Sequence, residues 1–202
     1  MTDTKIVYYI ARTSNSLVFD VDHYIKLIKN SINSLPDDQK IDFIILADKY
    51  CYDACLESGI QVSNLKKINY NYNGFMYNRM AVQHQFIIEN MVAGKSNLVF
   101  LDADILFDVC DSDIPTDKIT FIKRDNKKYP INGGFIALGA NSYEQAVTLW
   151  SLMLEEYKKY NTDLKEWFGD QVILREKVFL DNDLIATGTI NFASNGFYFE
   201  PK

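Results

Sequence analysis

The sequence predicts an α/β fold: a single Rossmann-like domain with a mostly parallel central sheet flanked by helices. Short apolar runs of strand length recur along the chain, and uninterrupted runs of this kind are typical of strands that are covered on both faces. Segments with apolar residues at helical spacing separate them, as expected of helices that connect parallel strands. With 202 residues, 48% of them hydrophobic, the chain has the size and composition of one domain with a full core.

Apolar patterning and turn residues predict the individual elements. Strands are expected at residues 5–10, 41–47, 98–101, 119–123 and 135–138, with a weaker one within 61–68 and a strand-like tail through 199. Helices are expected at residues 20–35, 75–92 and 143–160, and between Asp48 and Gly59. Asp48 is expected to cap its helix at the N-terminus, and Gly94 to end the helix at 75–92. We therefore expect one domain over residues 1–202, a length that is also compatible with the N-terminal part of a longer polypeptide.

Charge and cysteine usage exclude several classes of protein. The net charge of -6 argues against general binding to nucleic acid or to an anionic membrane, because both need a basic surface. No apolar stretch approaches the roughly 20 residues of a membrane span, and the N-terminus does not resemble a signal peptide. The three cysteines, Cys51, Cys55 and Cys110, form no zinc-like pattern. They indicate reduced thiols and a cytoplasmic protein.

The segment 97–107 carries two carboxylates through otherwise continuous apolar sequence. Asp102 and Asp104 follow the predicted strand 98–101, and in an extended chain residues two apart project to the same side. Two ionised carboxylates held that close repel each other unless a cation lies between them. A Mg²⁺ or Mn²⁺ ion shared with substrate phosphate oxygens would suit this pair. The plainer alternative is a strand end with Asp104 in a turn or helix cap.

Three other polar segments are candidate contacts for a ligand. Ala11, Arg12 and Thr13 follow the first predicted strand, where a base or ribose could bind, although an ordinary turn would have the same composition. Asn132, Gly133 and Gly134 precede the strand at 135–138, and paired glycines there indicate either a close approach of the backbone to another group or a plain tight turn. The basic residues of 123–128 suit a phosphorylated ligand or, more simply, a solvated loop.

Four short motifs occur in an order that resembles the nucleotide-sugar-dependent glycosyltransferases of the GT-A fold. Asp102-Ala103-Asp104 looks like the DxD signature of that family. The others, in chain order, are Tyr77-Asn78-Arg79-Met80, Asn132-Gly133-Gly134-Phe135 and Gly169-Asp170-Gln171. Each motif is weak alone, but the ordered set spans most of the chain. It is most similar to the retaining group that contains glycogenin and the bacterial lipopolysaccharide galactosyltransferases.

The resemblance implies a role for each motif. Asp102 and Asp104 would hold Mn²⁺ or Mg²⁺ against the donor diphosphate, with Ala103 between them, and Arg79 would approach the phosphates or the donor sugar. A solvated helix arginine is the plainer alternative for Arg79. Asn132, Gly133 and Gly134 would lie beneath the transferred sugar. Asp170 and Gln171 would bind its hydroxyls and stabilise the oxocarbenium-like centre. If the reaction inverts the sugar, Asp170 would instead be the general base.

One departure from the family pattern concerns the metal. Relatives supply a third ligand from a histidine near the C-terminus, whereas His23 and His84 are the two histidines here and both precede the signature. His84 falls in the middle of a predicted helix, where a packed or surface histidine is the simpler interpretation. Diphosphate and water, a tail residue such as Asn195, or residues beyond Lys202 would then complete the metal site.

The resulting hypothesis is a cytoplasmic, metal-dependent glycosyltransferase. It would move a sugar from a nucleotide-diphosphate donor, with UDP as the favoured nucleotide, to a glycan or glycoprotein acceptor, with retention. A non-catalytic nucleotide-sugar-binding module is one alternative. A phosphatase of the haloacid-dehalogenase type is a weaker one, because it requires Thr or Val where Leu106 stands.

Overall fold

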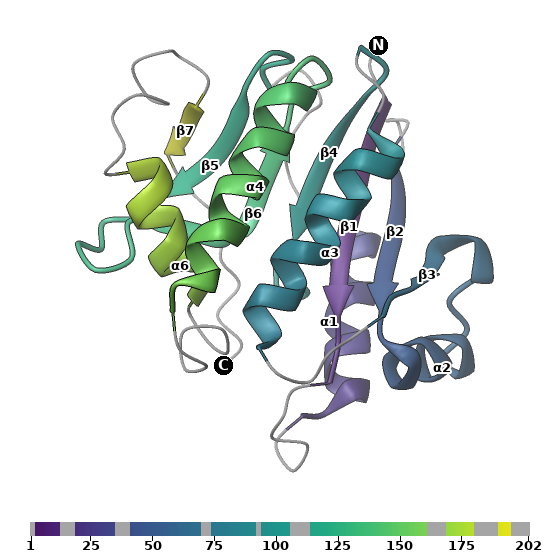
Figure 1. Ribbon diagram of the computed structural model, residues 1–202. Helices are drawn as coiled ribbons and strands as arrows, with labels where there is room; N and C mark the ends of the chain where they lie inside the picture. Colours follow the sequence, from purple (N-terminus) through teal and green to yellow (C-terminus); the bar gives the residue numbers. More distant parts are fainter. Residues whose placement is uncertain are drawn as a thin grey trace.

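A computed structural model describes residues 3–12, 19–34, 41–69, 74–91, 94–105, 114–160, 169–179 and 190–194 (Figure 1). It confirms the predicted α/β architecture: a mixed, mostly parallel sheet with helices on both faces. The strands are β1 (Asp3–Ile10), β2 (Ile41–Ala47), β3 (Leu65–Lys67), β4 (Ser96–Leu101), β5 (Ile119–Lys123), β6 (Ile131–Leu138) and β7 (Ile190–Ser194). The predictions that concern Thr13, Cys110 and Asn195 fall outside the described residues.

The sheet contains one strand that runs against the others. Its order is β3-β2-β1-β4-β6-β5-β7. β6 pairs antiparallel with β4 and with β5, and the remaining neighbours are parallel. The carboxyl ends of β1, β2, β4 and β5 therefore lie at one edge of the sheet. In open α/β sheets this is the edge at which ligands bind.

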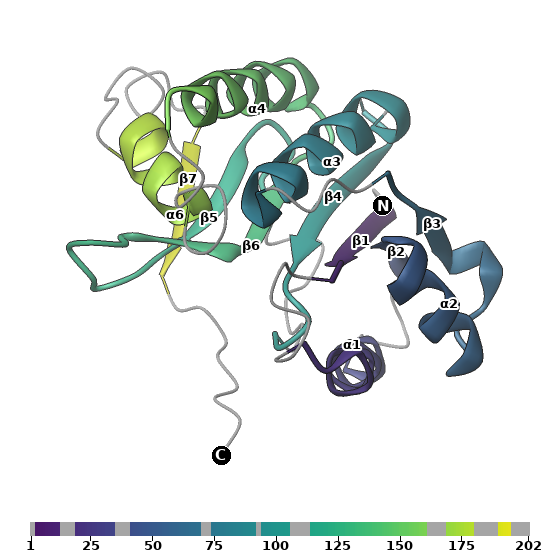
Figure 2. The same cartoon turned by 60° about the horizontal axis from the view of Figure 1, so that its bottom comes forward.

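Helices cover the two faces of the sheet separately. They are α1 (Val21–Asn33), α2 (Lys49–Glu57), α3 (Phe75–Asn90), α4 (Tyr143–Lys158) and α6 (Gly169–Leu174), with a 3₁₀ turn, η1 (Val62–Asn64), and a π-helical segment, η3 (Arg175–Phe179). Figure 2 shows α3, α4 and α6 on one side of the strands and α1 and α2 on the other. Among the described helices, none is long and apolar enough to cross a membrane.

Alternating strand residues supply the two cores. In β1, Val7 packs in the core beneath α3 and α4, whereas Ile6 and Tyr8 pack in the core beneath α1 and α2. This is the period of two that a sheet covered on both faces imposes. Trp150 of α4 is fully buried against the first core, and Cys51 and Cys55 of α2 are fully buried in the second. The two thiols are thus packing groups.

The predicted helix start at Asp48 is confirmed. Its Oδ1 accepts a hydrogen bond of 2.8 Å from the backbone N–H of Cys51, the usual bond of an N-cap. Its Oδ2 accepts one of 3.0 Å from the backbone N–H of Arg12. One buried carboxylate therefore joins the start of α2 to the chain that leaves β1.

Two predictions that placed glycines at the ends of elements are wrong. Helix α3 ends at Asn90 with Met91 as its C-cap, so Gly94 does not cap it. Gly94 has a φ of 78° and leads into β4 instead. Gly133 and Gly134 lie inside β6, which begins at Ile131, rather than at the entrance of a strand. In both cases the neighbouring elements, rather than the glycine itself, decide where a helix ends or a strand begins.

Candidate active site

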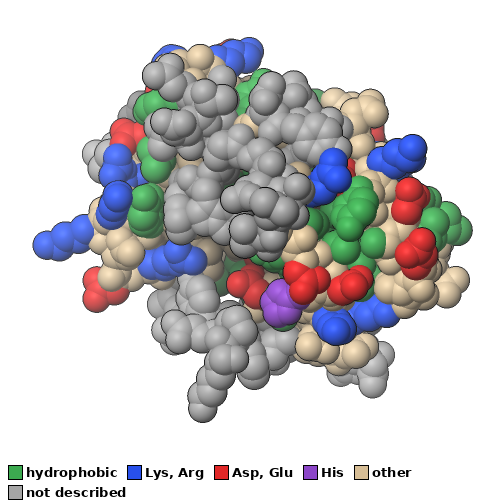
Figure 3. All heavy atoms as spheres, turned by 90° about the horizontal axis from the view of Figure 1, so that it is seen from below, with side chains coloured by type: hydrophobic (Ala, Val, Ile, Leu, Met, Phe, Trp, Pro, Cys, Tyr) green, Lys and Arg blue, Asp and Glu red, His purple; other side chains and the backbone are tan. Residues whose placement is uncertain are grey.

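A pocket of about 200 Å³ lies at the carboxyl ends of β1 and β4. The chain runs outward from β1 through β2 to β3 and then returns to place β4 on the other side of β1. The pocket thus occupies the topological switch point, the usual place for ligands in such sheets. Figure 3 views the molecule from this end and shows acidic side chains gathered there. The lining residues are Tyr9, Ile10, Ala11, Phe19, Tyr24, Phe75, Met76, Arg79, Asp102, Ala103, Asp104, Asp170 and Gln171.

Arg79 lies at the centre of the charged side of this pocket. Its side chain is 7% exposed, although it belongs to the first half of α3. Its Nη2 is 2.5 Å from Oδ1 of Asp102 and donates to the carbonyl oxygen of Gly133 at 3.1 Å. Its Nη1 is 3.8 Å from Oδ2 of Asp170. The alternative of a solvated helix arginine is therefore wrong, because Arg79 is a buried cation shared by two carboxylates.

The charge of Arg79 is stabilised by its neighbours. Burial alone would lower the pKa of its guanidinium, but Asp102 and Asp170, with Tyr9 and Tyr157, raise it above the ordinary value. A buried charge is tolerated only when it is paired and hydrogen-bonded. The three side chains of Arg79, Asp102 and Asp170 therefore form one electrostatic unit.

Asp170 is buried in the first turn of α6, with 3% of its surface exposed. Burial raises the pKa of its carboxyl, the charge of Arg79 lowers it, and the charge of Asp102 raises it, with a net rise. The backbone N–H of Gln171 donates to its Oδ1 at 2.8 Å. The carboxylate is thus held in one orientation beside the pocket.

Asp102 and Asp104 come together through a turn rather than through an extended strand. β4 ends at Leu101, and the backbone N–H of Ile105 donates to the carbonyl of Asp102 at 3.2 Å. The predicted alternation of side chains is therefore wrong at this point, because the chain has already left the sheet. Loss of surrounding water and the charge of Asp102 both raise the pKa of Asp104. The two carboxylates do share a region of negative potential, as the sequence predicts.

Buried hydroxyls support this turn from behind. Ser31 of α1 donates through Oγ to the carbonyl of Ile105 at 2.5 Å. The hydroxyl of Tyr8 on β1 lies 2.9 Å from the same Oγ. Because both side chains are fully buried, this chain of hydrogen bonds satisfies the backbone of the turn without water.

Gly133 and Gly134 of β6 lie in close contact with the carboxylates of Asp170 and Asp102. A Cβ atom on Gly133 would lie 2.3 Å from Oδ2 of Asp170, and one on Gly134 would lie 2.6 Å from Oδ2 of Asp102. Asp102 also donates from its backbone N–H to the carbonyl of Gly134 at 2.8 Å. The predicted close approach is confirmed, and the groups that approach are the side chains of the site itself.

Arg124, which the sequence suggested either for a phosphorylated ligand or for a solvated loop, contacts residues of the site. Its Nη2 donates to Oδ1 of Asn132 at 2.7 Å, and its Nη1 donates to Oε1 of Gln171 at 3.1 Å. The available signal was its position directly after β5, whose carboxyl end shares the edge of β1 and β4. Sequence alone does not reveal that order, because β6 lies between β4 and β5.

The segment after β1 is divided between the pocket and the surface. Ala11 is buried and lines the pocket. The backbone of Arg12 is held by Asp48, and its guanidinium lies over the ring of Tyr50, 5.3 Å from the centroid. The structure thus brings Ala11, but not the side chain of Arg12, to the site.

Aromatic side chains also line the pocket, and they were not among the site residues predicted from the sequence. Tyr9 meets Phe75 edge to face at 5.5 Å, and Phe19 stacks on Tyr24 at 5.2 Å between ring centroids. Burial and the charges of Asp104 and Asp102 raise the pKa of Tyr24. A pocket lined by aromatic rings and acidic side chains suits a ligand that has a flat ring and a charged or hydroxylated part.

The donor set around the Asp102–Asp104 turn fits a divalent cation in part. Within the described residues, no three or more His, Cys, Asp or Glu side chains are grouped to hold a metal. His84 lies instead beside Ser151 of α4, with 3.3 Å between its Nε2 and Oγ. Two carboxylates are nevertheless a sufficient protein contribution for Mg²⁺, which takes its other ligands from water and substrate phosphates.

Comparisons with known proteins find a similar fold but no similar sequence. No protein-family model matches the chain, and no curated protein matches its sequence. Among solved structures, the fold is similar to that of a glycosyltransferase involved in the glycosylation of the major capsid of PBCV-1. The identity is 12% and the TM-score 0.55, over 96% of this chain and 82% of that one. At this identity the similarity establishes the shared fold.

Proposed function

We propose that this chain is a metal-dependent glycosyltransferase that moves a sugar from a nucleotide-diphosphate donor, with UDP as nucleotide, to a glycan or glycoprotein acceptor. The observation that carries the proposal is the convergence of Asp102, Asp104 and Asp170 around buried Arg79 at the switch point of the sheet. Three of the four ordered motifs of the sequence supply these same residues. The fold shared with a glycosyltransferase is consistent with that assignment.

In this proposal the turn that carries Asp102 and Asp104 binds the donor diphosphate through a metal ion. Asp102 and Asp104 would hold Mn²⁺ or Mg²⁺, whose positive charge stabilises the negative charge that develops on the leaving nucleotide. Arg79 contributes by keeping Asp102 paired and oriented through its Nη2. Arg79 also lines the pocket, so direct contact with the donor phosphates or sugar stays part of the proposal. Its guanidinium is engaged at the same time by Asp102, Asp170 and the Gly133 carbonyl.

The remaining residues would receive the base and the sugar. Aromatic rings such as Tyr24 and Phe75 offer a surface on which a nucleobase stacks, and such stacking tolerates any base. Asp170 is the buried carboxylate available to the transferred sugar, where its charge would stabilise an oxocarbenium-like centre. Retention would assign Asp170 this electrostatic role, whereas inversion would assign it the role of general base.

The direct test is a screen of the purified protein against nucleotide-sugars, with Mn²⁺ and with chelator. We expect metal-dependent binding by calorimetry and metal-dependent release of the nucleotide. Proton NMR of the product then reports whether the anomeric configuration is retained. Binding without turnover and without metal dependence would support the non-catalytic module. Lack of binding to every nucleotide-sugar would remove the proposal.

Asp104→Asn is expected to abolish metal-dependent binding of UDP while leaving the thermal unfolding midpoint nearly unchanged. Asp104 is exposed, so the substitution removes a metal-binding charge and little packing. The matched control is Asp53→Asn, which removes an exposed carboxylate of α2. Calorimetry with UDP and Mn²⁺ compares the two variants. An unchanged affinity of Asp104→Asn would show that the metal assignment is wrong.

A further inference from the structure

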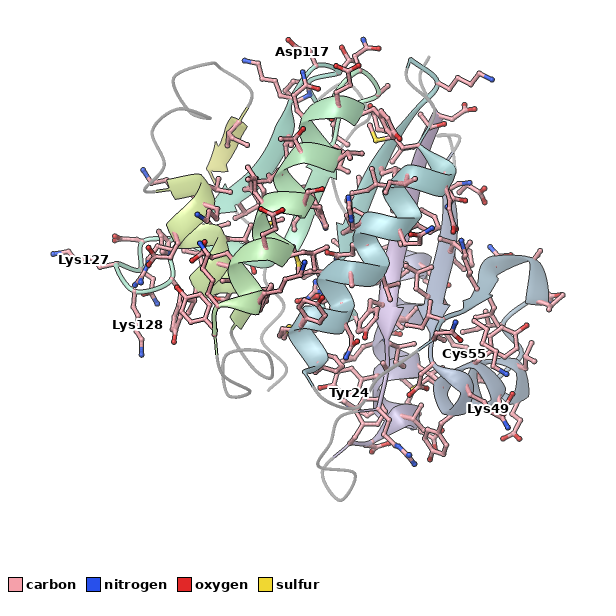
Figure 4. All side chains as sticks on the ribbon, in the orientation of Figure 1. Tyr24, Lys49, Cys55, Asp117, Lys127 and Lys128 are labelled. Carbon is pink, nitrogen blue, oxygen red and sulfur yellow. The ribbon has the colours of Figure 1, made fainter. Side chains whose placement is uncertain are left out.

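The guanidinium of Arg124 joins three elements beside the pocket. Arg124 follows β5, and its guanidinium donates to Asn132 of β6 and to Gln171 of α6. Oδ1 of Asn132 also accepts the backbone N–H of Gly134 at 3.0 Å. The neighbouring basic residues of the same hairpin are different, since Lys127 and Lys128 point away from the fold (Figure 4).

The pairing partner determines which way the two carboxamides face. A guanidinium has five N–H donors and no acceptor, so only the oxygen of an amide can face it. Oε1 of Gln171 is therefore directed at Arg124, and its Nε2 is the end left for other contacts. That Nε2 has no hydrogen bond with any residue in the described ranges. Gln171 nevertheless lines the pocket.

We infer that Arg124 is a positioning residue that turns Gln171 so that its Nε2–H group donates to an oxygen atom of the bound ligand. This inference rests on the proposed function, which identifies the ligand as a nucleotide-sugar. The accepting oxygen then belongs to a sugar hydroxyl or to a phosphate. It also changes the part that Gln171 plays. With its oxygen bonded to Arg124, Gln171 recognises an acceptor, and stabilisation of a cationic sugar centre falls to Asp170.

The same cation also supports the glycine pair. Asn132 is 3% exposed and receives both the Arg124 guanidinium and the Gly134 N–H on one oxygen. Pairing of β5 with β6 is irregular there, because Phe121 pairs with Ile136 whereas Ile122 pairs with Asn132. Three residues of β6 therefore bulge between two paired positions. Arg124 holds one end of this bulge, against which the carboxylates of the site rest.

Gln171→Glu is the sharpest test because it keeps the contact with Arg124 and removes the N–H donor that would face the ligand. The new carboxylate still accepts from Arg124, now as an ion pair, but it has no N–H to donate. We expect an unfolding midpoint near that of the wild type and a loss of at least about tenfold in affinity or kcat/KM. Wild-type activity in this variant would overturn the inference.

Binding of two ligands, one without and one with the sugar, tells whether the accepting oxygen belongs to a phosphate or to a sugar hydroxyl. UDP and UDP-glucose, or the nucleotide-sugar that the screen above identifies, are titrated with Mn²⁺ against Gln171→Glu. A loss of affinity for both ligands assigns the contact to a phosphate oxygen. A loss confined to the nucleotide-sugar assigns it to a sugar hydroxyl. An unchanged affinity for both contradicts the contact.

Arg124→Met tests the positioning itself. It frees the carboxamide of Gln171, so we expect the affinity for the same ligand that Gln171→Glu weakens to fall as well, and kcat/KM to fall by at least about tenfold. Arg124→Lys, which keeps the charge but not the planar fork, is expected to restore part of the loss. Lys95→Met removes a charge of the same sign from an exposed position and serves as the control. Equal effects of Lys95→Met and Arg124→Met would overturn the positioning role.

The contact can also be examined without any ligand. Arg124→Met, Gln171→Met and the double variant form a thermodynamic cycle in which a direct contact makes the shifts of the unfolding midpoint non-additive. Additive shifts would contradict the contact whatever the protein binds. Absence of nucleotide-sugar binding by the wild type would instead refute the proposed function and the ligand half of this inference, so the two failures remain distinguishable.

Discussion

Replacement of Arg79 by methionine is expected to lower the free energy of unfolding by about 3–5 kcal/mol, the usual cost of removing one partner of a buried ion pair. Methionine fills a similar space, so packing changes little. The variant instead leaves Asp102 and the buried Asp170 without their shared cation, and the Gly133 carbonyl without its donor. Chemical denaturation at pH 7 measures the difference. A loss below about 1 kcal/mol would contradict the central position given to Arg79.

The same variant is expected to recover stability as the pH falls. Burial already raises the pKa of Asp170 and Arg79 opposes that rise, so removal of Arg79 raises the pKa further. A carboxyl whose pKa is higher in the folded state than in the unfolded state binds more protons when folded. Its contribution to stability is therefore largest at low pH and declines as the pH rises through the folded pKa. The gap between Arg79→Met and the wild type should narrow from pH 7 to pH 5.

A surface ion pair provides the control for this experiment. Lys159→Met removes a cation whose side chain is 66% exposed and which lies 2.8 Å from Glu156. Exposed pairs contribute at most about 1 kcal/mol, because solvent screens them and the side chains lose entropy. A loss in Lys159→Met as large as that in Arg79→Met would mean that charge removal in general, rather than the buried unit, destabilises the protein.

Gly133→Ala is expected to reduce kcat/KM for the nucleotide-sugar by about 100-fold, the order of effect that a displacement of about 1 Å has on a positioned group. The added Cβ would lie 2.3 Å from Oδ2 of Asp170, so the carboxylate has to move. The obstructed atom is the end of a side chain, and it can rotate away. The effect should therefore fall on activity more than on the unfolding midpoint. Wild-type kinetics in this variant would show that the placement of Asp170 does not matter.

Gly59→Ala is the matched control for the glycine experiment. Nothing lies within 4 Å of the position that its Cβ would take, but its φ is 88°. The cost is therefore backbone strain of about 1 kcal/mol and no displacement of a site residue. We expect Gly133→Ala to lower activity more than stability, and Gly59→Ala to lower stability without changing activity.

Much of the fold could be predicted from local pattern. The strands at Ile41–Ala47 and Ile119–Lys123 have the predicted bounds, and Asp48 caps its helix as expected. These features depend on short runs of neighbouring residues, namely on apolar length and on the oxygen of one capping side chain. They can therefore be predicted before any tertiary contact is known.

The members of the site were predicted more completely than their relations to one another. Asp102, Asp104, Asp170, Arg79 and the glycine pair were all predicted as site residues. The pairing of Arg79 with two carboxylates was not predicted, nor were the contacts of Arg124 with Asn132 and Gln171. These partners come from elements distant in the chain, which no spacing within one segment reveals.

The α/β class, the order of the elements and the charged residues at the ends of strands all follow from local sequence patterns. The insertion of β6 between β4 and β5 does not, because it depends on contacts across the whole sheet. That insertion places Gly133, Asn132 and Arg124 beside the acidic turn and lets one guanidinium hold Asp102 and Asp170 together. Patterns of burial and capping act within a few residues. A buried charge is stabilised only by the partners that the complete fold brings to it.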